Sequence, residues 1–128
     1  HVSDVLGQQE YSDAQKKLDA FYEQEHPQRQ ITIVVTSCTV PPSASIYITG
    51  NHNSIGNWNP SFAMLSKNSD GNWEKTFTLR KGIQLEYKFT LGSWESEALD
   101  KNGNIQANSL LEIKSDTTLN ISIDSWKN

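Results

Sequence analysis

The pattern of apolar and polar positions changes near Pro27. Residues 11–26 contain neither glycine nor proline, and Leu18, Phe21 and Tyr22 recur at the spacing of one helical face. This pattern predicts one short amphipathic helix that Pro27 ends. Because its apolar stripe is narrow, three roles stay open: docking on the following domain, packing on a partner, or serving as a linker.

After Gln30 the pattern becomes that of β-strands. Six runs are rich in β-branched residues or alternate polar with apolar positions, namely 31–36, 45–49, 73–79, 84–91, 110–114 and 118–123. Polar turn sequences such as NSDGN and KNGN separate them. Short strands joined by polar turns are typical of an antiparallel β-sandwich. We therefore predict an all-β domain over residues 31–128, preceded by a helical extension or linker over residues 1–30.

Length, charge and cysteine content narrow the class of protein. A chain of 128 residues is the size of one domain. The formal net charge of −4 disfavours nucleic acid as a partner. No apolar run approaches the roughly 20 residues that span a bilayer, so no membrane insertion is expected. Cys38, the only cysteine, excludes an intramolecular disulfide and a thiolate zinc cluster, and its strand-like surroundings predict a core residue.

Motifs for catalysis and metal binding are missing from the sequence. His1, His26 and His52 are scattered and have no second ligand at the spacing of a metal site. There is no glycine-rich phosphate loop and no nucleophile elbow. A glycosidase needs two carboxylates about 5 to 9.5 Å apart across a cleft, which a small sandwich rarely provides. We predict that the chain has no catalytic residue, no metal and no cofactor.

Two tryptophans stand in polar surroundings. Trp58 lies in GNHNSIGNWNP at 50–60, and Trp94 lies in LGSWESE at 91–97. A buried indole normally has apolar neighbours, so these two are candidates for exposed rings that stack on the apolar faces of sugars. The alternative is that each is a core or corner residue of a small β domain. Composition alone leaves both interpretations open.

The run at 84–91 makes a prediction about Lys88. Side chains alternate between the two faces of a strand, so Tyr87 and Phe89 share one face and Lys88 lies on the other. If the aromatic pair is core, Lys88 reaches the surface. A lysine at such a position is ordinarily part of a solvated face.

Five segments, taken in order, resemble a known family. They are TVPPSASIYITGNHNSIGNWNP, DGNWEKTFTL, GIQLEYKFTLGSWE, NGNIQANSLLEI and LNISIDSW. In this order they resemble the starch-binding domains of carbohydrate-binding module family 20 and are similar to the related glycogen-binding modules of family 48. The resemblance covers residues 31–128. It implies an immunoglobulin-like antiparallel β-sandwich that binds α-glucan (starch, glycogen or maltooligosaccharide) without catalysis and targets a covalently attached hydrolase, esterase or glucanotransferase to polysaccharide.

The resemblance also implies the residues of a carbohydrate-binding site. The tryptophan of the family's G-x-W motif falls on Trp58, the lysine of its YKF motif on Lys88, and its second tryptophan on Trp94. Its acidic neighbour falls on Glu95, and the asparagine before the next strand falls on Asn108. Lys88 is therefore expected to hydrogen-bond sugar hydroxyls rather than to be an ordinary solvated lysine.

One departure from the family pattern limits the expectation to a single principal site. Some members bear a second glucan site built on two tyrosines, where this chain has Pro41, Pro42 and the segment SKNSDG at 66–71. An alternative function is a structural or docking sandwich of a larger glycan-active hydrolase or esterase, with sugar binding lost. Because the chain begins at His1 rather than Met and such modules act where polysaccharide is, we expect an extracellular, periplasmic or cell-surface location.

Overall fold

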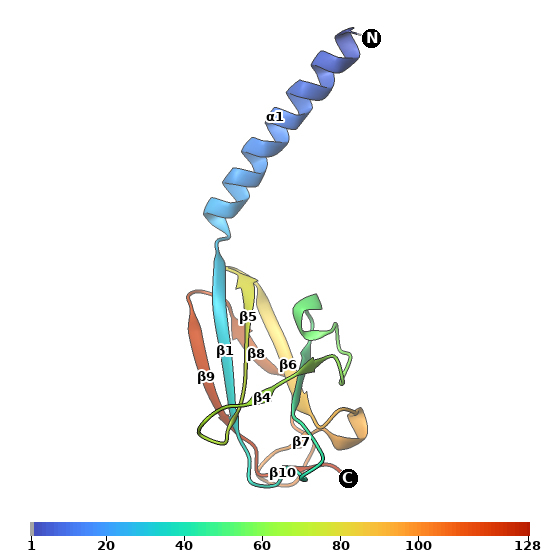
Figure 1. Ribbon diagram of the computed structural model, residues 1–128, viewed down its shortest axis with the longest axis vertical. Helices are drawn as coiled ribbons and strands as arrows, with labels where there is room; N and C mark the ends of the chain where they lie inside the picture. The colour runs from blue at the N-terminus through green and yellow to red at the C-terminus, as the bar shows by residue number, and fades with distance from the viewer. Residues whose placement is uncertain (1) are drawn as a thin grey trace.

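The computed structural model describes the backbone of residues 2–128 and the side chains of residues 13–128. One long helix, α1 (Val2–Glu25), leads into a set of strands (Figure 1). The strands are β1 (Gln28–Thr36), β2 (Tyr47–Gly50), β3 (Ala63–Met64), β4 (Ser66–Lys67), β5 (Trp73–Arg80), β6 (Gln84–Thr90), β7 (Ala98–Leu99), β8 (Ser109–Glu112), β9 (Thr117–Ser122) and β10 (Ser125–Trp126). Two 3₁₀ turns, η1 (Asn53–Ile55) and η2 (Trp94–Ser96), lie in the connections.

Two four-stranded sheets form the body of the molecule. Their strand orders are β4-β5-β1-β9 and β3-β2-β6-β8, and a short β10-β7 pair closes one end (Figure 1). Within the described chain, β1 and β9 are the one parallel pair, with Ile31 beside Thr117. The predicted all-β sandwich with an N-terminal helix is confirmed, and each of the six predicted runs contains a strand. The first strand begins at Gln28, three residues before the predicted boundary.

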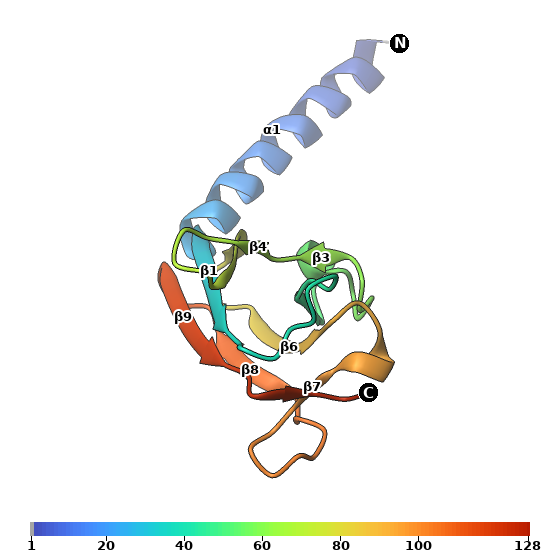
Figure 2. The ribbon, with the colours of Figure 1, turned by 60° about the horizontal axis from the view of Figure 1, so that its bottom comes forward.

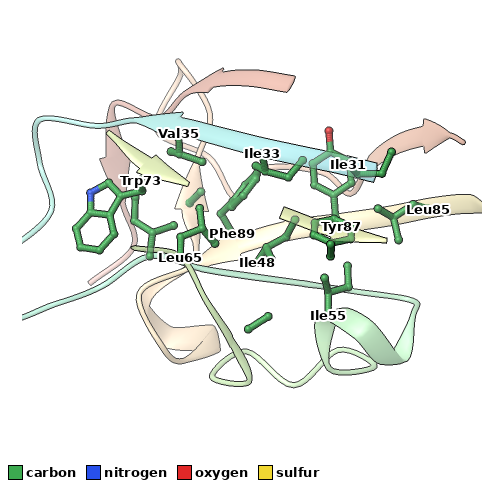
Figure 3. Close-up of a cluster of buried hydrophobic side chains, with 14 of the residues drawn as sticks. Ile31, Ile33, Val35, Ile48, Ile55, Leu65, Trp73, Leu85, Tyr87 and Phe89 are labelled. Atoms are coloured by element: carbon green, nitrogen blue, oxygen red, sulfur yellow. The ribbon is translucent and has the colours of Figure 1, made fainter. Parts of the chain in front are cut away.

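The core lies between the two sheets and follows the alternation of the strands. Ile31, Ile33 and Val35 of β1 point inward toward Tyr87 and Phe89 of β6 (Figure 3). Each of these side chains is less than 10% exposed, and full burial of such a group stabilises the fold by about 1.5–3 kcal/mol. Tyr87 and Phe89 therefore share the core face, as predicted, and the residue between them faces outward.

Helix α1 projects away from the sandwich (Figures 1 and 2). Leu18 and Phe21 are both 62% exposed, so the apolar stripe of the helix does not pack on the sandwich. The helix also begins at Val2 rather than near residue 11, because the preceding residues are largely helix-compatible. No helix within the described residues is long and apolar enough to cross a membrane.

Arg80 fixes the last turn of α1 to the sandwich. Its guanidinium forms an ion pair with Glu23, donates to the carbonyl of His26 at 3.1 Å and lies 5.1 Å from the ring centroid of Tyr22. The hydrogen bond from Arg80 holds the pKa of the Glu23 carboxyl below its ordinary value. The direction in which α1 leaves the sandwich is therefore set at the end of β5.

Cys38 does not lie in the core. It is exposed, two residues beyond the end of β1. The expectation of a buried cysteine is wrong because the strand-like run ends at Thr36, before the chain reaches position 38.

Candidate functional site

Trp58 and Trp94 lie against each other although 36 residues separate them in the sequence. Their ring centroids are 6.4 Å apart and the ring planes are tilted by 38°. Trp94 is 37% exposed and Trp58 is half-buried. Two indoles held together at the surface, with ring area left in contact with solvent, form an aromatic platform. We refer to this pair as the tryptophan platform.

The loop that carries Trp58 has an unusual backbone. Gly56, Asn57 and Trp58 have φ angles of 86°, 48° and 69°, three successive residues in the left-handed region. This region costs a non-glycine residue roughly 1–2 kcal/mol. Hydrogen bonds hold the conformation, from the Trp58 N–H to the carbonyl of Gly50 at 2.8 Å and from the Asn57 N–H to the carbonyl of His52 at 3.1 Å. The indole is therefore presented by a defined turn.

Trp94 stands at the start of η2, in the connection between β6 and β7. The Leu91 N–H donates to the carbonyl of Ser96 at 3.1 Å, which closes the loop on itself. The hydroxyls of Ser93 and Ser96 also lie 3.0 Å apart. These bonds fix the base of the loop, so the second indole is held as well.

Thr90, at the end of β6, ties the two tryptophan loops together. Its hydroxyl donates to the carbonyl of Pro60 at 2.6 Å and accepts from the Gly92 N–H at 3.0 Å. Pro60 lies two residues after Trp58, and Gly92 lies two residues before Trp94. Thr90 is fully buried, so both bonds are shielded from water. One hydroxyl thus links the supports of both indoles.

Lys88 lies two residues before Thr90 on the same outward face of β6. Its ammonium lies 3.1 Å from a carboxylate oxygen of Glu97, and the two side chains are 15% and 9% exposed. Thr49 of β2 is its neighbour in the register. A charged group so shielded from water and paired with a carboxylate has a fixed place rather than a mobile surface position.

Glu95 and Asn108, the remaining predicted site residues, are both exposed. Glu95 lies in η2 directly after Trp94. Asn108 precedes β8, whose first residue, Ser109, pairs with Tyr87. Lys88 follows Tyr87 on β6, and Asn108 precedes Ser109. Because the two strands are antiparallel, Asn108 lies toward the same end of the sheet as Lys88.

Sequence reasoning missed Glu97. The segment WESE contains two acidic residues, and the family pattern selected the one adjacent to the tryptophan. In the structure Glu97 forms an isolated antiparallel bridge with Thr90, which brings it level with β6. The only signal in the sequence was the second glutamate itself, because the bridge depends on the turn geometry between Leu91 and Ser96.

Among the described residues, no group of three or more His, Cys, Asp or Glu side chains is placed to hold a metal ion. A groove of about 640 Å³ lies elsewhere, between the segment 37–45 and β4, and its lining includes Pro41, Pro42 and Trp73. The lining of this groove does not include Trp58 or Trp94, whose partly exposed rings suit stacking on an extended ligand.

Comparison with known proteins assigns the chain to a family. The family model described as starch binding domain matches residues 28–119. The chain belongs to this family. The starch-binding domain is a non-catalytic module that binds α-glucan, which agrees with the resemblance found in the sequence.

Relatives with similar sequences are amylolytic enzymes. An α-amylase from Niallia circulans is 30% identical over 90 residues, which make up 70% of this chain and 7% of the amylase. An amylopullulanase from Thermoanaerobacter thermohydrosulfuricus is 32% identical over 75 residues, or 59% of this chain and 5% of that enzyme. The starch-binding domain thus spans a small part of the length of these relatives.

Solved structures share the fold. The family 20 carbohydrate-binding module of a maltotetraose-forming amylase from Pseudomonas saccharophila has a TM-score of 0.53 and 18% identity, and the match covers 73% of this chain and 98% of the module. A γ-cyclodextrin glucanotransferase (CGTase) from alkalophilic Bacillus clarkii has a TM-score of 0.57 and 24% identity, over 76% of this chain and 15% of the enzyme. These likenesses support the β-sandwich.

Proposed function

We propose that the starch-binding domain holds α-glucan on the tryptophan platform formed by Trp58 and Trp94. The contact between the two indoles carries the proposal, since one face built from two rings offers more stacking area than either ring alone. The apolar C–H faces of successive glucose units would lie on the rings. The tilt of 38° between the ring planes gives the surface a bend, which suits the curved path of an α-1,4-linked chain better than the flat path of a β-1,4-linked one.

Hydrogen bonds from polar neighbours set the orientation of the sugar. We assign this role to Lys88, with Glu95 and Asn108 at the edge of the tryptophan platform. An ammonium offers three donors and an asparagine side chain offers both donors and an acceptor, which match the mixed character of sugar hydroxyls. Glycogen and maltooligosaccharides present the same linkage and belong to the same ligand class.

The biological role that we propose is targeting. The amylolytic relatives are far longer than this chain, so we infer that the starch-binding domain is attached to a catalytic domain acting on α-glucan. Tethering an enzyme to polysaccharide raises its effective concentration at the substrate without any new catalytic contact. Such enzymes meet starch outside the cell, which favours an extracellular or cell-surface location.

Sedimentation with granular starch tests the proposal. We expect the wild-type protein to sediment with the granules and both Trp58→Ala and Trp94→Ala to stay in solution, since loss of one stacked aromatic ring costs about 1–3 kcal/mol. Phe21→Ala, which removes a more exposed ring on α1, is the matched control and should sediment like the wild type. Retention of wild-type sedimentation by both folded tryptophan variants would refute the proposed site. Failure of the wild type to bind would favour the structural or docking alternative.

A further inference from the structure

The ion pair between Lys88 and Glu97 is the most shielded charged contact near the tryptophan platform. The two side chains are 15% and 9% exposed and their charged atoms lie 3.1 Å apart. Transfer of two such groups out of water is unfavourable unless their remaining hydrogen-bonding capacity is used. Because a buried ion pair contributes little net stability, we looked for a role of Lys88 and Glu97 beyond stabilising the fold.

The backbone of Glu97 is held from two sides. It forms the bridge with Thr90 of β6, and its carbonyl accepts from the Lys127 N–H at 2.9 Å. Trp94 lies three residues earlier on the same loop. The carboxylate therefore comes from a rigid support that is continuous with one half of the tryptophan platform.

Lys88 retains unused hydrogen-bonding capacity. Among the described residues, Glu97 is the single hydrogen-bond partner of its ammonium, which has three donors. A lysine side chain is otherwise flexible, and binding of a ligand would have to immobilise it. A carboxylate that fixes the ammonium in advance removes part of that ordering cost and leaves the other donors directed away from it.

We propose that Glu97 is a positioning residue that holds the Lys88 ammonium for hydrogen bonding to sugar hydroxyls. The inference rests on the proposed function of the tryptophan platform. Glu97 acts through Lys88 and need not touch the sugar. Glu112 of β8, whose carboxylate lies 3.5 Å from the Lys114 ammonium in an exposed ion pair, serves as the comparison.

A double-mutant cycle followed by isothermal titration with β-cyclodextrin tests the proposal. We expect Glu97→Gln to weaken binding about tenfold, the effect of losing one hydrogen bond to a charged group. Glu112→Gln, the matched control, also removes the carboxylate of an ion pair, here the exposed one with Lys114, and should stay within about twofold of the wild type. In a Lys88→Met background, Glu97→Gln should cause no further loss, because it acts only through the lysine. A merely structural role for Glu97 would lower affinity in both backgrounds.

The outcomes separate this inference from the function on which it rests. Wild-type affinity in folded Glu97→Gln, or an equal loss with and without Lys88, would overturn the inference alone. Absence of binding by the wild-type protein would overturn the proposed function and the inference with it. If Glu97→Gln does not fold, Glu97→Asp replaces it in the same cycle: it keeps the charge but withdraws it by one methylene, and its affinity should fall only when Lys88 is present.

Discussion

Thr90 and Thr49 show how much the surroundings of one hydroxyl matter. Both residues are fully buried on the outward faces of neighbouring strands. The Thr90 hydroxyl has two hydrogen bonds, to Pro60 and Gly92. Among the described residues, the Thr49 hydroxyl has no partner. A buried polar group is favourable only when it is hydrogen-bonded, so these two threonines make opposite contributions.

The same substitution at the two positions should therefore have different effects. Thr90→Val should lower the free energy of unfolding by about 1–3 kcal/mol, because it leaves the Pro60 carbonyl and the Gly92 N–H without a partner. Thr49→Val should be neutral or stabilising by up to about 1 kcal/mol. Urea denaturation of the two variants measures both values. Equal losses would contradict the hydrogen-bonding pattern.

Residue-level features of the site were predictable only in part. The outward position of Lys88 followed from the alternation along β6, and the polar surroundings of Trp58 and Trp94 indicated surface loops. Their mutual contact was not predictable from the pattern, because it depends on the left-handed turn at Gly56, Asn57 and Trp58. The pairing of Lys88 with Glu97 was not predictable either, because it depends on the turn between Leu91 and Ser96.

At the scale of the elements, the junction between α1 and β5 is held by one arginine. Since Arg80 lowers the pKa of Glu23, the contribution of this pair is present above the ordinary pKa of a glutamate and is lost as the pH falls through the lowered pKa. The Arg80 and Glu23 side chains are partly exposed, so solvent screens the pair and the effect is local to the last turn of the helix.

A carboxyl titration by NMR checks this junction. In the wild-type protein the Glu23 pKa should lie below its ordinary range, and in Arg80→Met it should return to that range, because methionine keeps the aliphatic bulk and removes the charge. An identical Glu23 pKa in the two proteins would mean that the ion pair does not form in solution.

The elements themselves were predicted unevenly, for physical reasons. The runs that became β1, β5 and β6 are long enough to show a period of two. The strands β3, β4, β7 and β10 have two residues each, which is too short for an alternating pattern to show in the sequence. They are defined by their pairing with other strands in the folded protein. The start of α1 was misplaced because the first ten residues show no clear apolar stripe.

Across the whole chain, the net charge is concentrated in the same segment that forms the projecting helix α1. Residues 1–25 contain six of the 15 acidic and two of the 11 basic residues, so they carry the full net charge of −4, and the nine acids and nine bases that remain cancel. This acidic segment is also the part that projects from the sandwich (Figure 1). The β-sandwich is therefore close to neutral, and the helix carries the net charge.

Removal of residues 1–25 should leave a folded, glucan-binding sandwich. We expect a melting temperature within a few degrees of the full chain, because the exposed side chains of α1 bury little apolar surface. Solubility near neutral pH should fall with the loss of net charge. Calorimetry and starch sedimentation of the 26–128 fragment measure both. An unfolded fragment would show that α1 contributes to the core.

Titration of the 128-residue protein with maltoheptaose and with cellohexaose tests whether the tryptophan platform recognises α-glucan. The two ligands share glucose units and differ in linkage, so they separate recognition of a curved α-glucan from general stacking on tryptophan. We predict saturable binding of maltoheptaose at one site per chain, with quenching of tryptophan fluorescence, and no saturation by cellohexaose. Equal binding of both sugars, or no response to maltoheptaose, would contradict selective recognition of α-glucan by this domain.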